Sequence, residues 1–192
     1  MRILFAVLLL AALPAAHAQD AKPVRVLLRT EHGDIELELS PKAPKTAANF
    51  LRYVDAGLYD GGVFHRTVTP TNQPDNKVKI EVIQAGVNPA KAKNEFPPIK
   101  LERTKDTGLS HTDGAVSMAR DGPDTATGDF FVCVGAQPEL DFGGKRNPDG
   151  QGFAAFGRVV KGMDVVRKIQ TSPADGQAFR PPVCISAARR LP

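Results

Sequence analysis

The sequence has 192 residues but no tryptophan, only two tyrosines and only two cysteines. Two cysteines without C-x-x-C spacing exclude a disulfide-rich scaffold and a thioredoxin-like redox motif. The 17 glycines and 16 prolines follow no repeat, which excludes collagen and coiled coils and favours many turns between short elements. A chain of this length with 42% hydrophobic residues is expected to form one β-rich domain.

Long apolar runs are also scarce. The first one follows Arg2, covers residues 3–13 and ends before the small residues Ala16 and Ala18. This pattern predicts a secretory signal peptide at residues 1–18 and a single domain at residues 19–192. A membrane anchor is disfavoured because a helix needs roughly twenty apolar residues to cross a bilayer. We therefore expect export across the inner membrane to the periplasm, without stable membrane insertion.

Export would place Cys133 and Cys184 in an oxidising compartment, where they pair only if their Cα atoms come within roughly 4.4–6.8 Å. Both stand in short apolar runs that are typical of strands. Cysteines in such surroundings usually behave as small buried hydrophobes. We therefore predict two buried, unpaired thiols.

Charges and motifs exclude several functional classes. The 25 basic residues exceed the 21 acidic ones, which gives a formal net charge of +4. The sequence has no basic stripe with interleaved aromatic residues, so it does not indicate nucleic-acid binding. A P-loop, a G-x-G-x-x-G turn, a G-x-S-x-G elbow and an H-E-x-x-H helix are all absent. The histidines after residue 18 lack the spacing of metal ligands. The polar segments 121–124 and 147–150 are interpreted as turns and not as calcium loops, so no metal is expected.

Hydrophobic spacing predicts many short strands and two helices. Residues 24–30 and 35–39 form a predicted hairpin, since Ile35, Leu37 and Leu39 alternate with glutamates. Helices are predicted from Pro44 to Val54 and over 163–169. Further strand candidates are 63–68, 78–84, 115–119, 130–134, 154–160 and 183–187. This order favours a closed antiparallel barrel or a sandwich over a doubly wound sheet.

Several phrases also occur in a characteristic order. They are APKTAANF (43–50), YDGGVFHR (59–66), IQAG (83–86), GAVSMA (114–119), FFV (130–132), LD (140–141) and FGRVVKGMDVV (156–166). Together they resemble the cyclophilin family of peptidyl-prolyl cis-trans isomerases from Val24 to Ala188. The resemblance implies an all-β fold, a closed eight-stranded antiparallel barrel capped by two α-helices. It also implies a surface groove that binds extended, proline-containing polypeptides.

The resemblance assigns the catalytic role to Arg66, the arginine of the FHR phrase. Amide resonance gives an X-Pro bond a rotation barrier of about 18–20 kcal/mol. Rotation localises the lone pair on the proline nitrogen, so a hydrogen-bond donor aimed there stabilises the twisted state more than the planar one. A guanidinium supplies a permanent charge and a rigid fork of donors. No covalent bond is made, so we expect no cofactor.

The remaining site residues are expected to hold the peptide. Phe131, in the FF pair that resembles the family, is the predicted floor of an apolar proline pocket. Alternation along the strand places one Phe of the pair in the barrel core and the other on the groove side. Gln84 is expected to bind the substrate backbone. The other predicted lining residues are Val82, Ala119, Arg120, Leu140 and Phe153.

The chain departs from the family pattern at several positions. Glu81 and Glu139 each stand where the family commonly has an aromatic residue, and Asp129 stands where it has a glutamine. Glu81 is expected to make the pocket wall less apolar. The segment 69–77 is part of a long connection and is predicted to be a solvent-exposed loop beside the groove. The leading hypothesis is a monomeric prolyl isomerase that assists folding of exported chains. The alternative is a non-catalytic peptide-binding or chaperone-like module.

Overall fold

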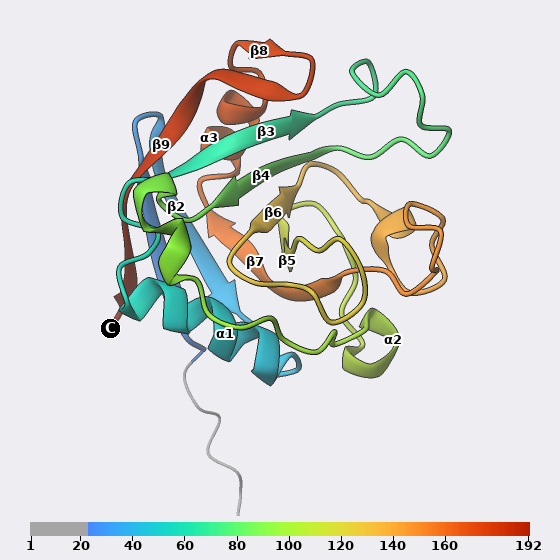
Figure 1. Cartoon of the computed structure of the whole chain (residues 1–192), viewed down its shortest axis with the longest axis horizontal. Helices are drawn as coiled ribbons and strands as arrows, with labels where there is room; N and C mark the ends of the chain where they lie inside the picture. Colours follow the sequence, from blue (N-terminus) through green and yellow to red (C-terminus); the bar gives the residue numbers. More distant parts are fainter. Residues whose placement is uncertain (1–22) are drawn as a thin grey trace, which may run out of the picture.

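The computed structural model describes residues 23–192, and the predicted signal peptide lies outside them (Figure 1). The strands are β1 (Arg25–Thr30), β2 (Gly33–Leu39), β3 (Gly62–Val68), β4 (Val82–Gly86), β5 (Ala115–Met118), β6 (Phe130–Cys133), β7 (Ala154–Lys161), β8 (Ala174–Asp175) and β9 (Ala178–Leu191). Eight of them close an antiparallel barrel in the order β1–β2–β7–β5–β6–β4–β3–β9, with β9 pairing back onto β1. This confirms the predicted barrel.

The first hairpin shows why these residues form strands. Ile35, Leu37 and Leu39 on β2 are buried, whereas Glu36 and Glu38, which alternate with them, point outward. Glu36 pairs with Lys161 on β7 at 2.9 Å, and Glu38 accepts hydrogen bonds from the arginines on both sides. The period of two therefore separates the core from a charged outer face, as predicted.

Two helices cover the barrel. Helix α1 (Pro44–Asp55) begins with proline in its first turn, and its buried face packs against β7 and β9. Helix α3 (Met163–Gln170) buries Val166 and Ile169 and packs against β2 and β4. The weakly patterned stretch before β5 holds only short turns, the 3-10 helix η1 (Pro89–Asn94) and helix α2 (Thr104–Thr107). Within residues 23–192 no helix is long and apolar enough to cross a membrane.

Strand β6 separates two hydrophobic clusters. Phe130 is fully buried in the main core, where its ring packs edge-on against Phe50 with centroids 5.3 Å apart. The next residue, Phe131, belongs to a second, smaller cluster outside this core. The predicted division of the Phe-Phe pair between barrel and groove is therefore confirmed.

The predicted strand over 78–84 is wrong in its first half, because β4 begins at Val82. Gln73, buried in the long connection, satisfies the backbone before that point. Its amide nitrogen donates to Ile80 O at 2.8 Å, and its amide oxygen accepts from Ile80 N at 3.4 Å. A side chain thus takes the place of a neighbouring strand. The rest of segment 69–77 is exposed or half-buried, as predicted, and only Gln73 is buried.

The predicted strand over 183–187 is the middle of β9, which runs much further because β1 and β3 pair with its two edges. Both cysteines are unpaired, and Cys133 is buried. The predicted burial of Cys184 is wrong, since its side chain is exposed. Val183 and Ile185 point inward, so strand alternation directs the residue between them to solvent.

Candidate active site

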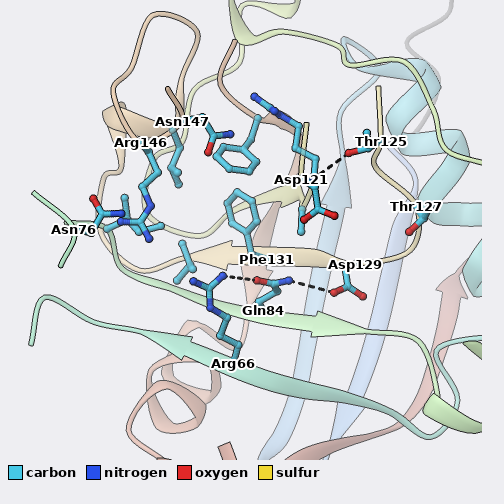
Figure 2. Close-up of a pocket in the computed structure, with 16 residues that line it drawn as sticks. Arg66, Asn76, Gln84, Asp121, Thr125, Thr127, Asp129, Phe131, Arg146 and Asn147 are labelled. Atoms are coloured by element: carbon cyan, nitrogen blue, oxygen red, sulfur yellow. Dashed lines mark hydrogen bonds between the residues drawn. The ribbon is translucent and has the colours of Figure 1, made fainter. Parts of the chain in front are cut away.

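The barrel register brings the central predicted residues into one row. Arg66 on β3 pairs with Gln84 on β4, and Gln84 pairs in turn with Phe131 on β6. These side chains lie beside a cavity of about 420 Å³ on the barrel surface (Figure 2). All the other predicted site residues line the same cavity: Val82, Ala119, Arg120, Leu140 and Phe153. The structure therefore brings the whole predicted set together.

The floor of the cavity is apolar. Phe131 is only 4% exposed, and it packs in the small cluster with Val82 and Leu140. The ring of Phe153 meets Phe131 nearly at right angles, with centroids 5.3 Å apart. This geometry gives the cavity a closely packed apolar floor, on which an apolar ring can rest.

Arg66 is held by two glutamine side chains. Its Nη1 donates to Gln84 Oε1 at 3.1 Å, and its Nε and Nη2 both donate to Gln177 Oε1 at 2.9 and 2.7 Å. Burial lowers the pKa of the guanidinium, which nevertheless stays charged at neutral pH. Among the described residues no carboxylate forms an ion pair with Arg66. Its charge is therefore oriented but not neutralised.

Gln84 connects Arg66 to Asp129. Its Nε2 donates to Asp129 Oδ2 at 3.2 Å, and its Oε1 accepts from Arg66 (Figure 2). The oxygen and the nitrogen of the amide therefore each have a hydrogen-bond partner. Asp129 Oδ2 also lies 3.6 Å from His65 Nε2. Burial raises the pKa of the Asp129 carboxyl, and the nearby imidazole and the Gln84 amide partly oppose this shift. The Asp129 position thus helps to orient Gln84.

The side chain of Arg120 supports the cavity from the side. Its Nη1 and Nη2 donate to the two carboxylate oxygens of Asp149 at 2.8 and 3.0 Å, and its guanidinium lies over the Phe153 ring. The backbone of the neighbouring Ala119 donates to Asp129 O at 2.9 Å. Asp149 lies in the segment 147–150, where Gly150 N donates to Asn147 O as in a turn. The predicted turn at this position is confirmed.

A positive end of the cavity was missed by the sequence analysis. Arg146 and Asn147 come from the loop between η2 (Pro138–Leu140) and β7, and Asn76 comes from the connection between β3 and β4. Arg146 joins the two loops, since its Nη1 donates to Gln73 Oε1 and to Val78 O, each at 2.7 Å. In Figure 2 these residues lie on one side of Phe131, and Asp121 and Asp129 lie on the other. The cavity therefore has one basic and one acidic end.

Comparison with known proteins identifies the family. The model of the family "Cyclophilin type peptidyl-prolyl cis-trans isomerase/CLD" matches residues 25–190. The chain belongs to this family. It is 38% identical over 172 residues to peptidyl-prolyl cis-trans isomerase A of Dickeya dadantii, covering 88% of this chain and 83% of that protein. It is also 38% identical to peptidyl-prolyl cis-trans isomerase B of Escherichia coli, over 76% and 83% of the two chains.

Solved cyclophilin structures share the fold. A cyclophilin type peptidyl-prolyl cis-trans isomerase of Cryptosporidium parvum superposes with a TM-score of 0.72, at 21% identity, over 89% of this chain and 99% of that one. A second structure of that protein, in the presence of the dipeptide Ala-Pro, gives a TM-score of 0.70 at 21% identity over 88% of this chain and 99% of that one. The predicted family is confirmed, and the chain is an isomerase of the cyclophilin type.

Two of the acidic departures lie away from the cavity of this cyclophilin. The Glu81 carboxylate accepts a hydrogen bond from Gln170 of α3 and does not line the cavity. The expectation that Glu81 makes the pocket wall less apolar is therefore wrong. The Glu139 carboxylate turns back to accept from Lys145 N at 2.8 Å and also stays outside the lining. Of the three departures, only Asp129 reaches the cavity.

Proposed function

We propose that this cyclophilin accelerates rotation about X-Pro bonds in the cavity described above, with Arg66 as its catalytic residue. The observation that carries the proposal is the position of Arg66 beside an apolar floor, held by neutral amides only. A proline ring placed on Phe131 would bring its ring nitrogen to the side of the cavity that Arg66 occupies. This is a non-covalent reaction and it needs no cofactor.

The chemistry follows from the electronic structure of the amide. In the twisted state the nitrogen lone pair is no longer delocalised, so it accepts a hydrogen bond that the planar amide does not accept. A preorganised donor of this kind contributes about 3 kcal/mol in other enzymes, or roughly a hundredfold in rate. The uncompensated charge of Arg66 strengthens that bond. Burial of the prolyl ring against Phe131 holds the reacting bond in place.

Gln84 has a double role in this proposal. In the unliganded site its oxygen orients Arg66, and its nitrogen is bound to Asp129. A substrate carbonyl that approaches the Gln84 amide would share this nitrogen with the carboxylate. Ala119 and Arg120 line the same cavity, next in sequence to Asp121. We propose that an extended polypeptide crosses the cavity between these edges.

The cellular role proposed for the protein is assistance to folding chains after export, in the periplasm and as a monomer. The support is the signal-peptide pattern at residues 1–18, in which a basic residue, an apolar run and small residues follow in order. X-Pro isomerisation takes tens to hundreds of seconds without a catalyst, so chains that fold after export gain from acceleration.

The experiment compares catalysis with binding. A protein beginning at Gln19 is mixed with a short X-Pro peptide, and cis-to-trans conversion is followed in a protease-coupled assay while binding is followed by NMR. Acceleration in proportion to protein concentration is the expected result. Binding without acceleration would contradict the isomerase proposal and favour the binding module. Periplasmic protein is expected to start at Gln19, and soluble protein that retains Met1 would contradict the export proposal.

A further inference from the structure

The turn between β8 and β9 lies beside the catalytic arginine. Ala178, the first residue of β9, pairs in register with Arg66 on β3. The carbonyl of Gln177 accepts a hydrogen bond from Thr67 N at 2.8 Å, which fastens the turn to the same strand. Gly176 adopts a positive φ of 58°, a conformation that suits glycine and lets the turn reverse tightly. Figure 1 shows β9 beside β3, with β8 on the far side of β9.

The amide of Gln177 joins Arg66 to the long connection between β3 and β4. Its Oε1 accepts from both Nε and Nη2 of Arg66, and its Nε2 donates to the Asn72 carbonyl at 3.0 Å. The Asn72 side chain in turn donates to Thr67 O at 3.0 Å and to Gly176 O at 3.1 Å. Because the amide nitrogen has its own acceptor, the oxygen of Gln177 is fixed on the side of Arg66.

We propose that Gln177 is a positioning residue for Arg66 and that the Asn72 carbonyl sets the orientation of the Gln177 amide. This inference rests on the proposed role of Arg66. An arginine has five N–H donors, and the two glutamines engage one on each of its three nitrogens. The second hydrogens of Nη1 and Nη2 remain for the substrate. A neutral acceptor orients this fork without offsetting its charge, whereas a carboxylate at the same place would offset it.

The long connection thereby acquires a role in catalysis. Its first residues hold the Asn72 carbonyl against the β8–β9 turn, because Thr69 N donates to Asn72 Oδ1 at 2.8 Å. A change in this segment can therefore reach Arg66 through the side chain of Gln177. Through this contact the segment can influence the rate of the reaction, in addition to the place of its Asn76 in the cavity lining.

The test uses Gln177→Leu, which keeps the approximate size of the side chain and removes the acceptor. The matched control is Gln170→Leu, which removes a nearby glutamine whose side chain binds Glu81 and does not contact Arg66. The kcat and KM for an X-Pro peptide are measured for both variants. The exchange of the Arg66 Nε–H with water is measured by NMR, with its resonance assigned from its loss in Arg66→Ala.

For Gln177→Leu we expect at least a tenfold loss of kcat, a KM within twofold of wild type, and exchange of the Arg66 Nε–H that is at least tenfold faster. Gln170→Leu should change none of these three quantities by more than twofold. Unchanged exchange in Gln177→Leu would overturn the inference, as would an unchanged kcat in an active protein. If the wild type does not catalyse isomerisation, the proposed function fails, and the exchange measurement still decides whether Gln177 holds Arg66.

Discussion

The imidazole ring of His111 stacks on the buried side of the Phe131 ring, with centroids 5.9 Å apart and planes 17° from parallel. His111 is itself held on both sides, by Asp141 Oδ1 at Nδ1 (2.7 Å) and by Ser117 Oγ at Nε2 (2.9 Å). Asp141 directly follows the pocket residue Leu140. This arrangement supports the Phe131 floor of the cavity and links it to the neighbouring Leu140.

His111→Leu should therefore destabilise the fold. The substitution leaves Ser117 Oγ buried without its partner, at a cost of about 1–3 kcal/mol, and also removes the hydrogen bond to Asp141. The measurement is the free energy of unfolding in urea. His32→Leu is the control, since His32 is half-buried and its side chain makes one hydrogen bond within the described residues, to Ser172 Oγ. Equal stabilities of the two variants would contradict the proposed support.

Gln73→Leu should loosen the long connection between β3 and β4. The buried backbone groups of Ile80 lose the amide that replaces a strand neighbour, which should cost about 1–3 kcal/mol of unfolding free energy. Urea denaturation and amide hydrogen exchange of residues 78–81 measure the change. The control is Asp75→Ala at an exposed position of the same segment. Unchanged exchange at Ile80 would show that Gln73 does not organise this segment.

Asp129→Asn should raise the stability at neutral pH. Burial raises the carboxyl pKa in the folded state, so the folded protein binds this proton more tightly than the unfolded chain does. Stability is then lost as pH rises from the unfolded pKa of about 3.9 through the higher folded pKa. We expect a higher Tm than wild type at pH 7 and a difference that narrows towards pH 3.

The matched control is the same Asp-to-Asn change at Asp75, an exposed position of the loop, which should keep a Tm close to that of wild type at pH 7. A Tm of Asp129→Asn below that of wild type at pH 7 would contradict the effect of burial. It would show that the charged hydrogen bond to Gln84 and the contact with His65 outweigh desolvation.

The two thiols should react at very different rates. Burial raises the pKa of the Cys133 thiol, and its side chain is closed to reagents, whereas Cys184 is exposed. An alkylating reagent should label Cys184 in the native protein and Cys133 only after denaturation. Mass spectrometry of the labelled peptides measures both sites. Absence of any label in the denatured, unreduced protein would instead reveal a disulfide.

The sequence was sufficient to predict the barrel and the central site because these features follow local rules. Alternation divided the pair Phe130 and Phe131 between the core and the groove. The short motifs of the family then indicated Phe131, Arg66, Gln84 and the remaining lining residues. These motifs contain the site residues because they lie on neighbouring strands, whose register brings Arg66, Gln84 and Phe131 into one row.

The supports of the site could not be predicted in the same way. Gln177 is 111 residues from Arg66 in sequence, and its contact depends on how a two-residue turn docks onto β3. Arg146 comes from a loop whose pattern indicates turns and not its final position. Gln73 replaces a strand through side-chain hydrogen bonds that no hydrophobic period reveals. These contacts arise from tertiary packing of polar loops.

The central claim is that Arg66 lowers the barrier to X-Pro rotation. Its most direct test compares the isomerisation rates of wild type, Arg66→Ala and Arg66→Lys on one X-Pro peptide, with melting curves recorded for all three. We predict that Arg66→Ala loses roughly a hundredfold in rate while remaining folded, because one preorganised donor is lost. Arg66→Lys should also be badly impaired, since it keeps the charge without the planar fork. An unchanged rate in folded Arg66→Ala would contradict the account.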